Sequence, residues 1–247
     1  MAWFEDKFNS RYRGLKRPYE DLPYQRKKVY SFSLTLKIIF INVAVFFILL
    51  LYLLFTKNEE LILNNLALRP SFILNGRNLW TLITHMFVHL DPFHLLMNMI
   101  SLSFIGSFVE KLIGKKRFFW LYLIGGFIAG LFFVFLAGFF GSNTIGERLF
   151  GNPFIFAVGA SGAIFALAGL LTVLTPRIKV LVFFIIPMPL WIGILFLLFF
   201  FWILSLIGGL PIGNSAHLGG FLCGLIYGFY LRRKYPNKVR ILQRIFS

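Results

Sequence analysis

Long apolar stretches separated by short polar segments dominate the chain from residue 34 onward. A bilayer core about 30 Å thick is crossed by a helix of roughly 20 apolar residues, and six stretches approach that length. We expect membrane-spanning helices at residues 34–55, 93–112, 118–140, 159–175, 190–207 and 216–231. The pattern therefore predicts an all-α membrane protein, a compact bundle of six transmembrane helices with both ends on one side.

The apolar run at residues 180–207 is too long for one upright helix. Pro187 and Pro189 interrupt this run, and proline lacks the N–H that a helix interior requires. We therefore expect a short interfacial segment before the fifth span.

The composition supports insertion into a membrane. Of the 247 residues, 58% are hydrophobic, 14% are charged and 33 are phenylalanine. Soluble domains have about 45–50% apolar and about 25% charged residues, so the class of soluble globular proteins is excluded. The single cysteine, Cys223, excludes an intramolecular disulfide, and we interpret it as a small packing residue.

Positive charge is distributed unevenly between the two sides of the predicted bundle. In this topology 21 of the 25 Lys and Arg residues lie on the side of the chain ends; the other four are Lys57, Arg69, Arg77 and Arg148. The positive-inside rule therefore predicts cytoplasmic N- and C-termini, in a multi-pass protein of the cell membrane. The net charge of +16 makes anionic lipid headgroups expected partners. Nucleic acid is not expected, because the basic residues are divided among short loops and tails.

We divide the chain into a basic cytoplasmic N-terminal segment (1–33), a membrane domain (34–231) and a basic cytoplasmic C-terminal tail (232–247). In the first segment Trp3, Phe4, Phe8 and Tyr12 fall near one helical face. Two interpretations stay open there, a helix lying on the membrane surface and a flexible basic tail.

One serine and four histidines are the polar residues of greatest chemical interest. They are His85, His89 and His94 around the start of the second span, Ser161 at the beginning of the fourth, and His217 in the sixth. Polar groups at membrane depth are costly unless they face a cavity or one another, which makes them candidate functional residues. A single membrane histidine often only hydrogen-bonds between helices, but His94 shares a helical face with Asn98.

The sequence around Ser161 and His217 favours contact between the fourth and sixth spans. The sixth span has a small residue at every fourth position, namely Ala216, Gly220, Gly224 and Gly228. Such a stripe lets membrane helices approach closely, and a serine hydroxyl becomes an effective nucleophile when a base lies within hydrogen-bond reach. We predict that His217 activates Ser161, and that a helix-start N–H, His94 and Asn98 stabilise a developing oxyanion.

Three other hydrolase classes fit the sequence less well. His85 and His89 have the spacing of a zinc-binding HExxH helix, but Met86 stands where the general-base Glu is required. An intramembrane aspartyl protease needs two Asp residues in spans, and no predicted span contains one. The G-x-S-x-G elbow of soluble hydrolases is absent, because Ala163 occupies the second Gly position. We therefore expect no metal and no cofactor.

Three ordered motifs resemble signatures of the rhomboid protease family. Residues 85–98 (HMFVHLDPFHLLMN) resemble its second-helix signature, and residues 159–162 (GASG) are similar to its GxSG serine motif. Residues 216–224 (AHLGGFLCG) resemble its sixth-helix AHxGGxxxG pattern. The resemblance covers roughly residues 34–231 and leaves the basic ends outside it.

The resemblance implies a six-helix rhomboid-like bundle with a Ser161–His217 dyad and no third acid. It implies oxyanion support from His94, Asn98 and the Ser161 backbone. The expected supporting positions are Phe165, Gly159, Gly162, His89, Gly220 and Gly224. Glu110 also matches a family position, with a structural role at the inner end of the second helix; an interfacial carboxylate paired with Lys111 or Lys115 is the alternative.

Two positions depart from the family pattern. The outer loop between the first two spans often carries Trp-Arg, whereas this chain has Trp80-Thr81, which puts any role of that arginine in doubt. Many members have a tyrosine one turn after the serine, against which the histidine ring packs, and this chain has Phe165. A phenyl face still packs on imidazole, so we expect activity to survive.

The resemblance implies an intramembrane serine protease that cleaves single-span membrane proteins in or near their transmembrane segments. An extended segment must reach Ser161, so helix-destabilising residues in the substrate favour cleavage. The Gly-rich outer loop at 208–215 is either a lid or an ordinary interhelix turn. The alternatives are a catalytically inactive rhomboid-like scaffold for binding or quality control of membrane proteins, and a six-span transporter or channel.

Overall fold

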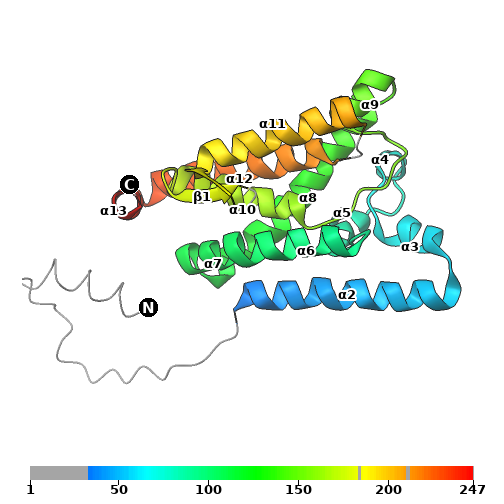
Figure 1. Ribbon diagram of the computed structural model, residues 1–247, viewed down its shortest axis with the longest axis horizontal. Coiled ribbons are helices and arrows are strands. Elements are labelled where there is room, and N and C mark those ends of the chain that lie inside the picture. Colours follow the sequence, from blue (N-terminus) through cyan, green and yellow to red (C-terminus); the bar gives the residue numbers. More distant parts are fainter. Residues whose placement is uncertain (1–32, 183–184, 210–211, 247) are drawn as a thin grey trace, which may run out of the picture. The chain divides into compact units, whose positions relative to one another are not determined.

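The computed structural model describes residues 33–182, 185–209 and 212–246, and residues 32–247 group as one compact unit. The two interpretations of the first 33 residues therefore fall almost wholly outside the described part, as do positions 210 and 211 of the outer loop. The elements are α2 (Leu34–Thr56), α3 (Glu59–Leu66), α4 (Pro70–Leu74), α5 (Thr81–Thr84), η1 (His85–Phe87), α6 (Pro92–Ser101), η2 (Leu102–Gly106), α7 (Ser107–Ile113), α8 (Lys115–Phe140), α9 (Thr144–Phe150), α10 (Ser161–Leu174), β1 (Lys179–Val182), β2 (Ile186–Pro189), α11 (Leu190–Gly208), α12 (Asn214–Lys234) and α13 (Pro236–Ile245) (Figure 1).

Four helical stretches of the described ranges are long and apolar enough to cross a membrane. They are α2, the continuous stretch Pro92–Ile113 made by α6, the π-helical turn η2 and α7, then α8 and α11. Helix α10 has 14 residues, which span only about 21 Å at 1.5 Å per residue. Helix α12 has 21 residues, but glycines and three terminal cations lower its apolar content. The chain is thus a mostly helical, multi-pass membrane protein, and the count of six spans stays a prediction.

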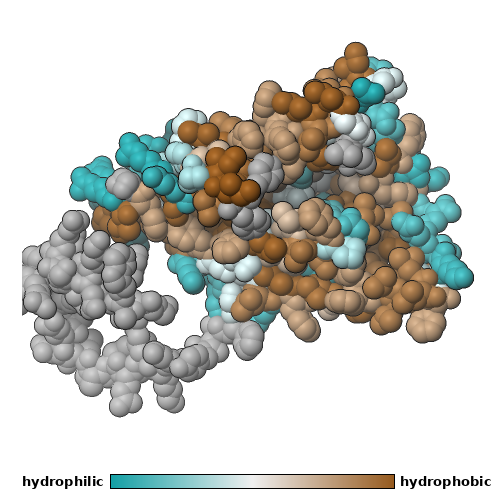
Figure 2. Space-filling view, in the orientation of Figure 1, coloured by the Kyte–Doolittle hydropathy of each residue, from teal (hydrophilic) through white to brown (hydrophobic). Residues whose placement is uncertain are grey.

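The surface of the bundle matches a lipid environment. Large apolar side chains of α2 and α11 are exposed, among them Phe40, Phe47 and Phe55 on α2 and Phe199 on α11. Figure 2 shows apolar side chains between two ends at which hydrophilic residues gather. In lipid this arrangement stabilises the protein, because apolar surface faces acyl chains and charged residues reach the headgroups.

Helix α10 is the central helix of the core and is buried at nearly every position. Its neighbour α8 runs antiparallel to it: a Cβ atom on Gly125 would overlap Ala166, and one on Gly162 would lie 2.6 Å from the Cβ of Ala129. Because membrane helices gain packing energy only by close backbone approach, these small residues set the distance between α8 and α10.

Glu110, near the end of α7, holds the beginning of α2. Its two carboxylate oxygens accept hydrogen bonds from the hydroxyls of Ser33 and Thr35 and from the backbone N–H groups of Leu34 and Thr35, at 2.7–2.9 Å. N–H groups of a first helical turn have no acceptor within their own helix, and a carboxylate at that end also interacts favourably with the helix dipole. The buried carboxylate of Glu110 therefore has a structural role, as the family position implied.

Several helix ends meet on one side of the bundle, which we call the basic side. Helix α2 begins there, beside the end of α7. Arg117 of α8 donates a 2.9 Å hydrogen bond to the hydroxyl of Tyr235, directly after α12, so α8 begins and α12 ends on a shared side. Since α8 follows α7 after the single residue Gly114, all four helix ends lie on this side.

Residues 179–182 and 186–189 form a pair of β-strands, so the all-α prediction is wrong there. Strands β1 and β2 pair antiparallel, with Lys179 opposite Pro189 and Leu181 opposite Pro187. In a two-stranded antiparallel sheet, every second residue of a strand points its N–H group away from the other strand. Pro187 and Pro189 are two residues apart and can both occupy such positions, where the missing N–H costs no hydrogen bond between the strands. Proline was correctly predicted to interrupt the apolar run, but the segment before α11 is a strand pair. A second difference is α13, a helix within the basic C-terminal tail.

We expect Glu110→Gln to lower the free energy of unfolding by on the order of 3 kcal/mol, since hydrogen bonds to a charged group contribute about 1.5–3 kcal/mol each. The amide has one acceptor oxygen, and its NH₂ group would face donors. Thermal unfolding of the purified protein in detergent measures the change. The matched control is Glu59→Gln, an exposed carboxylate in the first turn of α3. Equal melting temperatures of the two variants would contradict the role of Glu110.

Candidate active site

The fold brings Ser161 and His217 together from segments 56 residues apart in sequence. Ser161 is the first residue of α10, and His217 lies in the first turn of α12. Nε2 of His217 is 2.8 Å from Oγ of Ser161. His217 is buried and Ser161 is half-buried. At this distance the hydroxyl can donate its proton to the imidazole when the oxygen attacks an electrophile.

Glycines of α12 permit this contact. A Cβ atom on Gly220 would overlap the carbonyl oxygen of Gly162, and one on Gly224 would overlap the carbonyl oxygen of Ala166. Residue numbers rise together along the two helices, so α10 and α12 run parallel. Their first turns, which carry the candidate serine and histidine, therefore lie at the same end of the bundle, opposite the basic side.

Two phenyl rings contact the imidazole of His217. Phe165, one turn after Ser161, stacks on it with 4.6 Å between ring centroids and 24° between planes. Phe201 of α11 contacts it at 5.8 Å and 55°. Among the described residues, Nδ1 of His217 has no hydrogen-bond partner. Aromatic packing therefore takes the place of a carboxylate in orienting the ring.

The sequence pattern alone does not identify Phe201. Helix α11 carries several phenylalanines in succession, so the pattern distinguishes none of them. Ser205, a small polar residue in this otherwise apolar helix, is the sequence feature that could have indicated where α11 contacts α12. Its Oγ accepts a 2.7 Å hydrogen bond from Nδ2 of Asn214, the first residue of α12. This buried pair fixes the start of α12 to α11 and so places Phe201 beside His217.

His94 and Asn98 lie over the backbone that precedes Ser161. Gly159 has φ = +115°, a conformation that side chains rarely adopt. A Cβ atom there would lie 2.8 Å from Nε2 of His94 and 3.9 Å from Nδ2 of Asn98. The N–H of Ser161, at the first position of α10, has no acceptor within the helix. Three candidate donors thus gather around Gly159, next to the candidate nucleophile.

The remaining two histidines lie in the outer loop and have different surroundings. Nδ1 of His85 is 2.7 Å from the carbonyl oxygen of Thr81, and the carbonyl oxygen of His85 accepts a hydrogen bond from the N–H of Gly159. The ring of His89 packs edge-on against that of His94, with centroids 5.1 Å apart. Burial lowers the pKa of His89 to about 4, which disfavours the charged form of this ring.

Trp80 and Thr81, where the chain departs from the family's Trp-Arg pattern, form hydrogen bonds within the outer loop. Thr81 is buried, and its hydroxyl donates to the carbonyl oxygen of Asn78 at 2.7 Å, while Nε1 of Trp80 donates to that of Asn65 at 2.7 Å. A β-bridge between Leu68 and residue 157 joins the loop to the segment before α10. Across the ranges that the structure describes, no three His, Cys, Asp or Glu side chains are grouped to hold a metal ion.

Comparison with known proteins identifies the family of this chain. The rhomboid domain matches residues 76–234. RHOMBOID-like protein 1 of Arabidopsis thaliana is 35% identical over 164 residues, which are 66% of this chain and 37% of that protein. Rhomboid protein 1, mitochondrial, of Saccharomyces cerevisiae is 28% identical over 215 residues, 85% of this chain and 57% of that protein. The chain thus spans roughly a third to a little over half of these relatives, and its matched domain contains Ser161, His217, His94 and Asn98. The chain belongs to the rhomboid family.

Proposed function

We propose that this protein is an intramembrane serine protease that hydrolyses peptide bonds in or near the transmembrane segments of single-span membrane proteins. The 2.8 Å contact between Oγ of Ser161 and Nε2 of His217 carries the proposal. Oγ attacks the scissile carbonyl carbon while its proton passes to Nε2, and the same proton then goes to the leaving amine. Water, deprotonated by His217 in turn, releases the acyl group from Ser161.

This chemistry requires one tautomer of His217. Nε2 must be free to accept a proton, so the ring proton resides on Nδ1 in the resting enzyme. Stacking on Phe165 and contact with Phe201 hold the ring plane so that Nε2 faces Ser161. These two rings are positioning residues, because they act through His217 and do not touch the reacting atoms.

We assign oxyanion stabilisation to His94, Asn98 and the N–H of Ser161. The support is their position around Gly159, whose positive φ brings the backbone directly under the His94 ring. Donors that are already in place before charge develops are worth most in a water-poor site. His89, packed on His94, would hold that ring in position.

We propose six membrane crossings, with α10 and α12 added to the four stretches that are both long and apolar enough to cross a membrane. The parallel packing of α10 on α12 supports this number. As the fourth and sixth of six successive crossings, the two helices would run in the same direction, each beginning on the side of the candidate active site. The basic side faces the cytoplasm in this proposal, with both termini, and the substrate enters laterally from the lipid. We propose the cell membrane as location; the yeast relative is named as mitochondrial.

We expect Ser161→Ala and His217→Ala each to lower the cleavage rate of a model transmembrane substrate by at least about 10⁴-fold, because either change removes the dyad. Purified variants in liposomes, with thermal unfolding measured alongside, provide the test. A fluorophosphonate probe should label the wild type and not Ser161→Ala. Undiminished cleavage by folded Ser161→Ala would refute the dyad, and substrate capture without cleavage by the wild type would indicate a scaffold.

Loss of one oxyanion donor should have a graded effect. We expect His94→Ala and Asn98→Ala each to lower kcat by about 10²-fold with a smaller change in KM, since donors matter more in the transition state than in the bound substrate. The control is Asn65→Ala, whose side chain lies in α3 of the outer loop. Wild-type turnover in both single variants and in their double variant would reassign the pair to helix packing.

Substitutions of the two phenyl rings test positioning. We expect Phe165→Tyr to retain near-normal turnover, because the stacked face is preserved, and Phe165→Leu to lose about tenfold or more as the imidazole rotates more freely. Phe201→Leu should act in the same direction and more weakly, given its longer contact. Steady-state kinetics of variants that are as stable as the wild type distinguish a ring that positions His217 from one that only fills the core. Full activity in a stable Phe165→Leu protein would show that the ring only fills space.

A further inference from the structure

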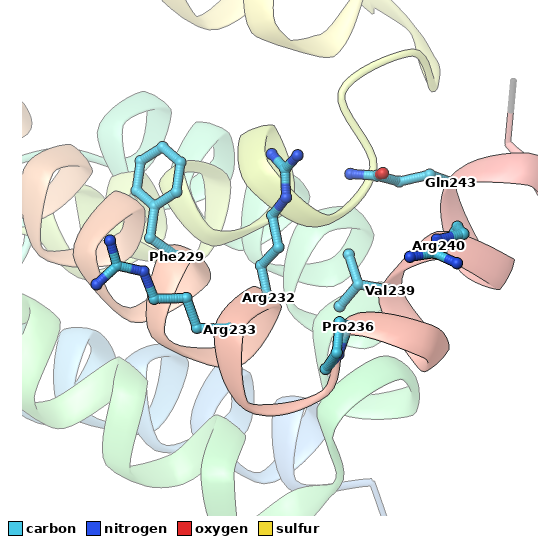
Figure 3. Close-up of a pocket in the computed structure, with 7 residues that line it drawn as sticks. All are labelled: Phe229, Arg232, Arg233, Pro236, Val239, Arg240 and Gln243. Atoms are coloured by element: carbon cyan, nitrogen blue, oxygen red, sulfur yellow. The ribbon is translucent and has the colours of Figure 1, made fainter.

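A pocket with a basic lining lies at the end of the bundle opposite Ser161, where α12 ends and α13 begins. Its volume is about 390 Å³, and its lining includes Phe229, Arg232, Arg233, Val239, Arg240 and Gln243. Figure 3 shows Arg232 and Gln243 extending into the space above Val239, with Arg233 on the side of Phe229. His217 and Arg232 lie near opposite ends of α12, and at 1.5 Å per residue they are about 22 Å apart along the helix.

The charge of the pocket is not neutralised by the described part of the chain. The guanidinium groups of Arg232, Arg233 and Arg240 are exposed, and none has an ion-pair or hydrogen-bond partner among the described residues. From residue 148 to residue 247 the sequence contains no Asp or Glu. The negative end of α12 and the positive end of α13 adjoin here, so their dipoles largely offset one another and the three formal charges dominate. The pocket therefore favours an anion.

The walls of the pocket are held in place independently of any ligand. Val239 is buried against the bundle, and Nε2 of Gln243 donates a 3.1 Å hydrogen bond to the carbonyl oxygen of Val173 on α10. Tyr235, between α12 and α13, is fixed by its hydrogen bond from Arg117. Arg240 on α13 is thus presented at a defined position relative to Arg232 on α12. Two guanidinium groups carried by helix ends that are fixed relative to one another can both reach the oxygens of one phosphate group.

An apolar track leads from the pocket along α12. Leu222, Ile226 and Phe229 are spaced by four and three residues, so they share one helical face, and they are 38%, 71% and 52% exposed. Phe229 itself lines the pocket. A ligand that joins an anionic head to an apolar chain would meet charge at the helix end and apolar side chains along the helix. A soluble anion would use only the first of these features.

We propose that this pocket is a binding site for the phosphate headgroup of an anionic phospholipid in the leaflet on the basic side, with an acyl chain lying along Leu222, Ile226 and Phe229. The site is defined by Arg232 and Arg240, with Arg233 at its rim and Gln243 fixing the α13 wall. It differs from general attraction between a basic protein and a charged membrane in having a half-open pocket of defined lining and an adjoining apolar track. The proposal does not depend on the protease activity.

The test measures lipid binding to purified, delipidated full-length protein by native mass spectrometry. The probes are dioctanoyl phosphatidylglycerol, dioctanoyl phosphatidylcholine and inorganic phosphate. We expect the wild type to bind phosphatidylglycerol at least about tenfold more tightly than either other probe. The double variant Arg232→Gln/Arg240→Gln should weaken that binding by about 10- to 30-fold, as each basic residue near an anionic surface contributes about 1 kcal/mol, and tenfold corresponds to about 1.4 kcal/mol.

Two further variants distinguish a defined pocket from a diffuse basic surface and from a site for soluble anions. Lys111→Gln/Lys116→Gln removes the same charge from exposed positions on the basic side outside the pocket, and should change binding less than about threefold. Phe229→Ser should weaken phosphatidylglycerol binding and leave inorganic phosphate binding unchanged. Equal loss in both double variants would overturn the proposal in favour of a diffuse field. Equal affinity for phosphate and lipid would overturn it in favour of a soluble anion.

The chain's own acidic residues are the remaining competitor for the pocket. Glu5, Asp6, Glu20 and Asp21 are converted to their amides in one variant. Unchanged phosphatidylglycerol affinity in this variant supports the lipid site. A rise of tenfold or more would overturn the proposal, because it would show that the N-terminal segment occupies the pocket.

Discussion

Helices α10 and α12 pack in direct backbone contact, and this contact determines most of the arrangement at the candidate active site. Gly220 and Gly224 rest on carbonyl oxygens of α10, so any side chain there would separate the helices. Lipid offers little hydrophobic drive for helix association, which leaves close van der Waals contact as the main attraction. The hydroxyl of Ser161 and the imidazole of His217 project from these helices and meet only at this separation. Shape complementarity of two backbones thus underlies the proposed chemistry.

The surroundings of His217 show how an imidazole can be oriented without a carboxylate. A buried carboxylate in this apolar region would carry a large desolvation cost. Two phenyl rings restrict the imidazole instead, one carried by α10 and the other by α11. This solution makes the position of α11 relevant to the dyad, since a shift of that helix would move Phe201 away from His217.

The pattern of polar residues in apolar segments predicted the main partners at the site, because unpaired polar groups are rare at membrane depth. The position of Phe165 followed from helical periodicity, one turn after Ser161. The contact of Phe201 with His217 and the pairing of β1 with β2 could not be predicted from the sequence in the same way. An apolar run of this length fits a helix or a buried strand, and its tertiary contacts decide between them. The π-helical turn η2 was likewise not predicted, because its sequence LSFIG contains no distinctive signal.

The proposed nucleophile and base lie on different helices, and the base lies on α12, the last long helix of the bundle. A ribosome must therefore complete nearly all of the membrane domain before Ser161 has a partner. Fragments that end before α12 would carry a serine with an ordinary, weakly reactive hydroxyl. If the proposed dyad is correct, placing the base late in the chain keeps the serine unreactive during synthesis, because the membrane receives the protein helix by helix and the dyad forms only when α12 packs on α10.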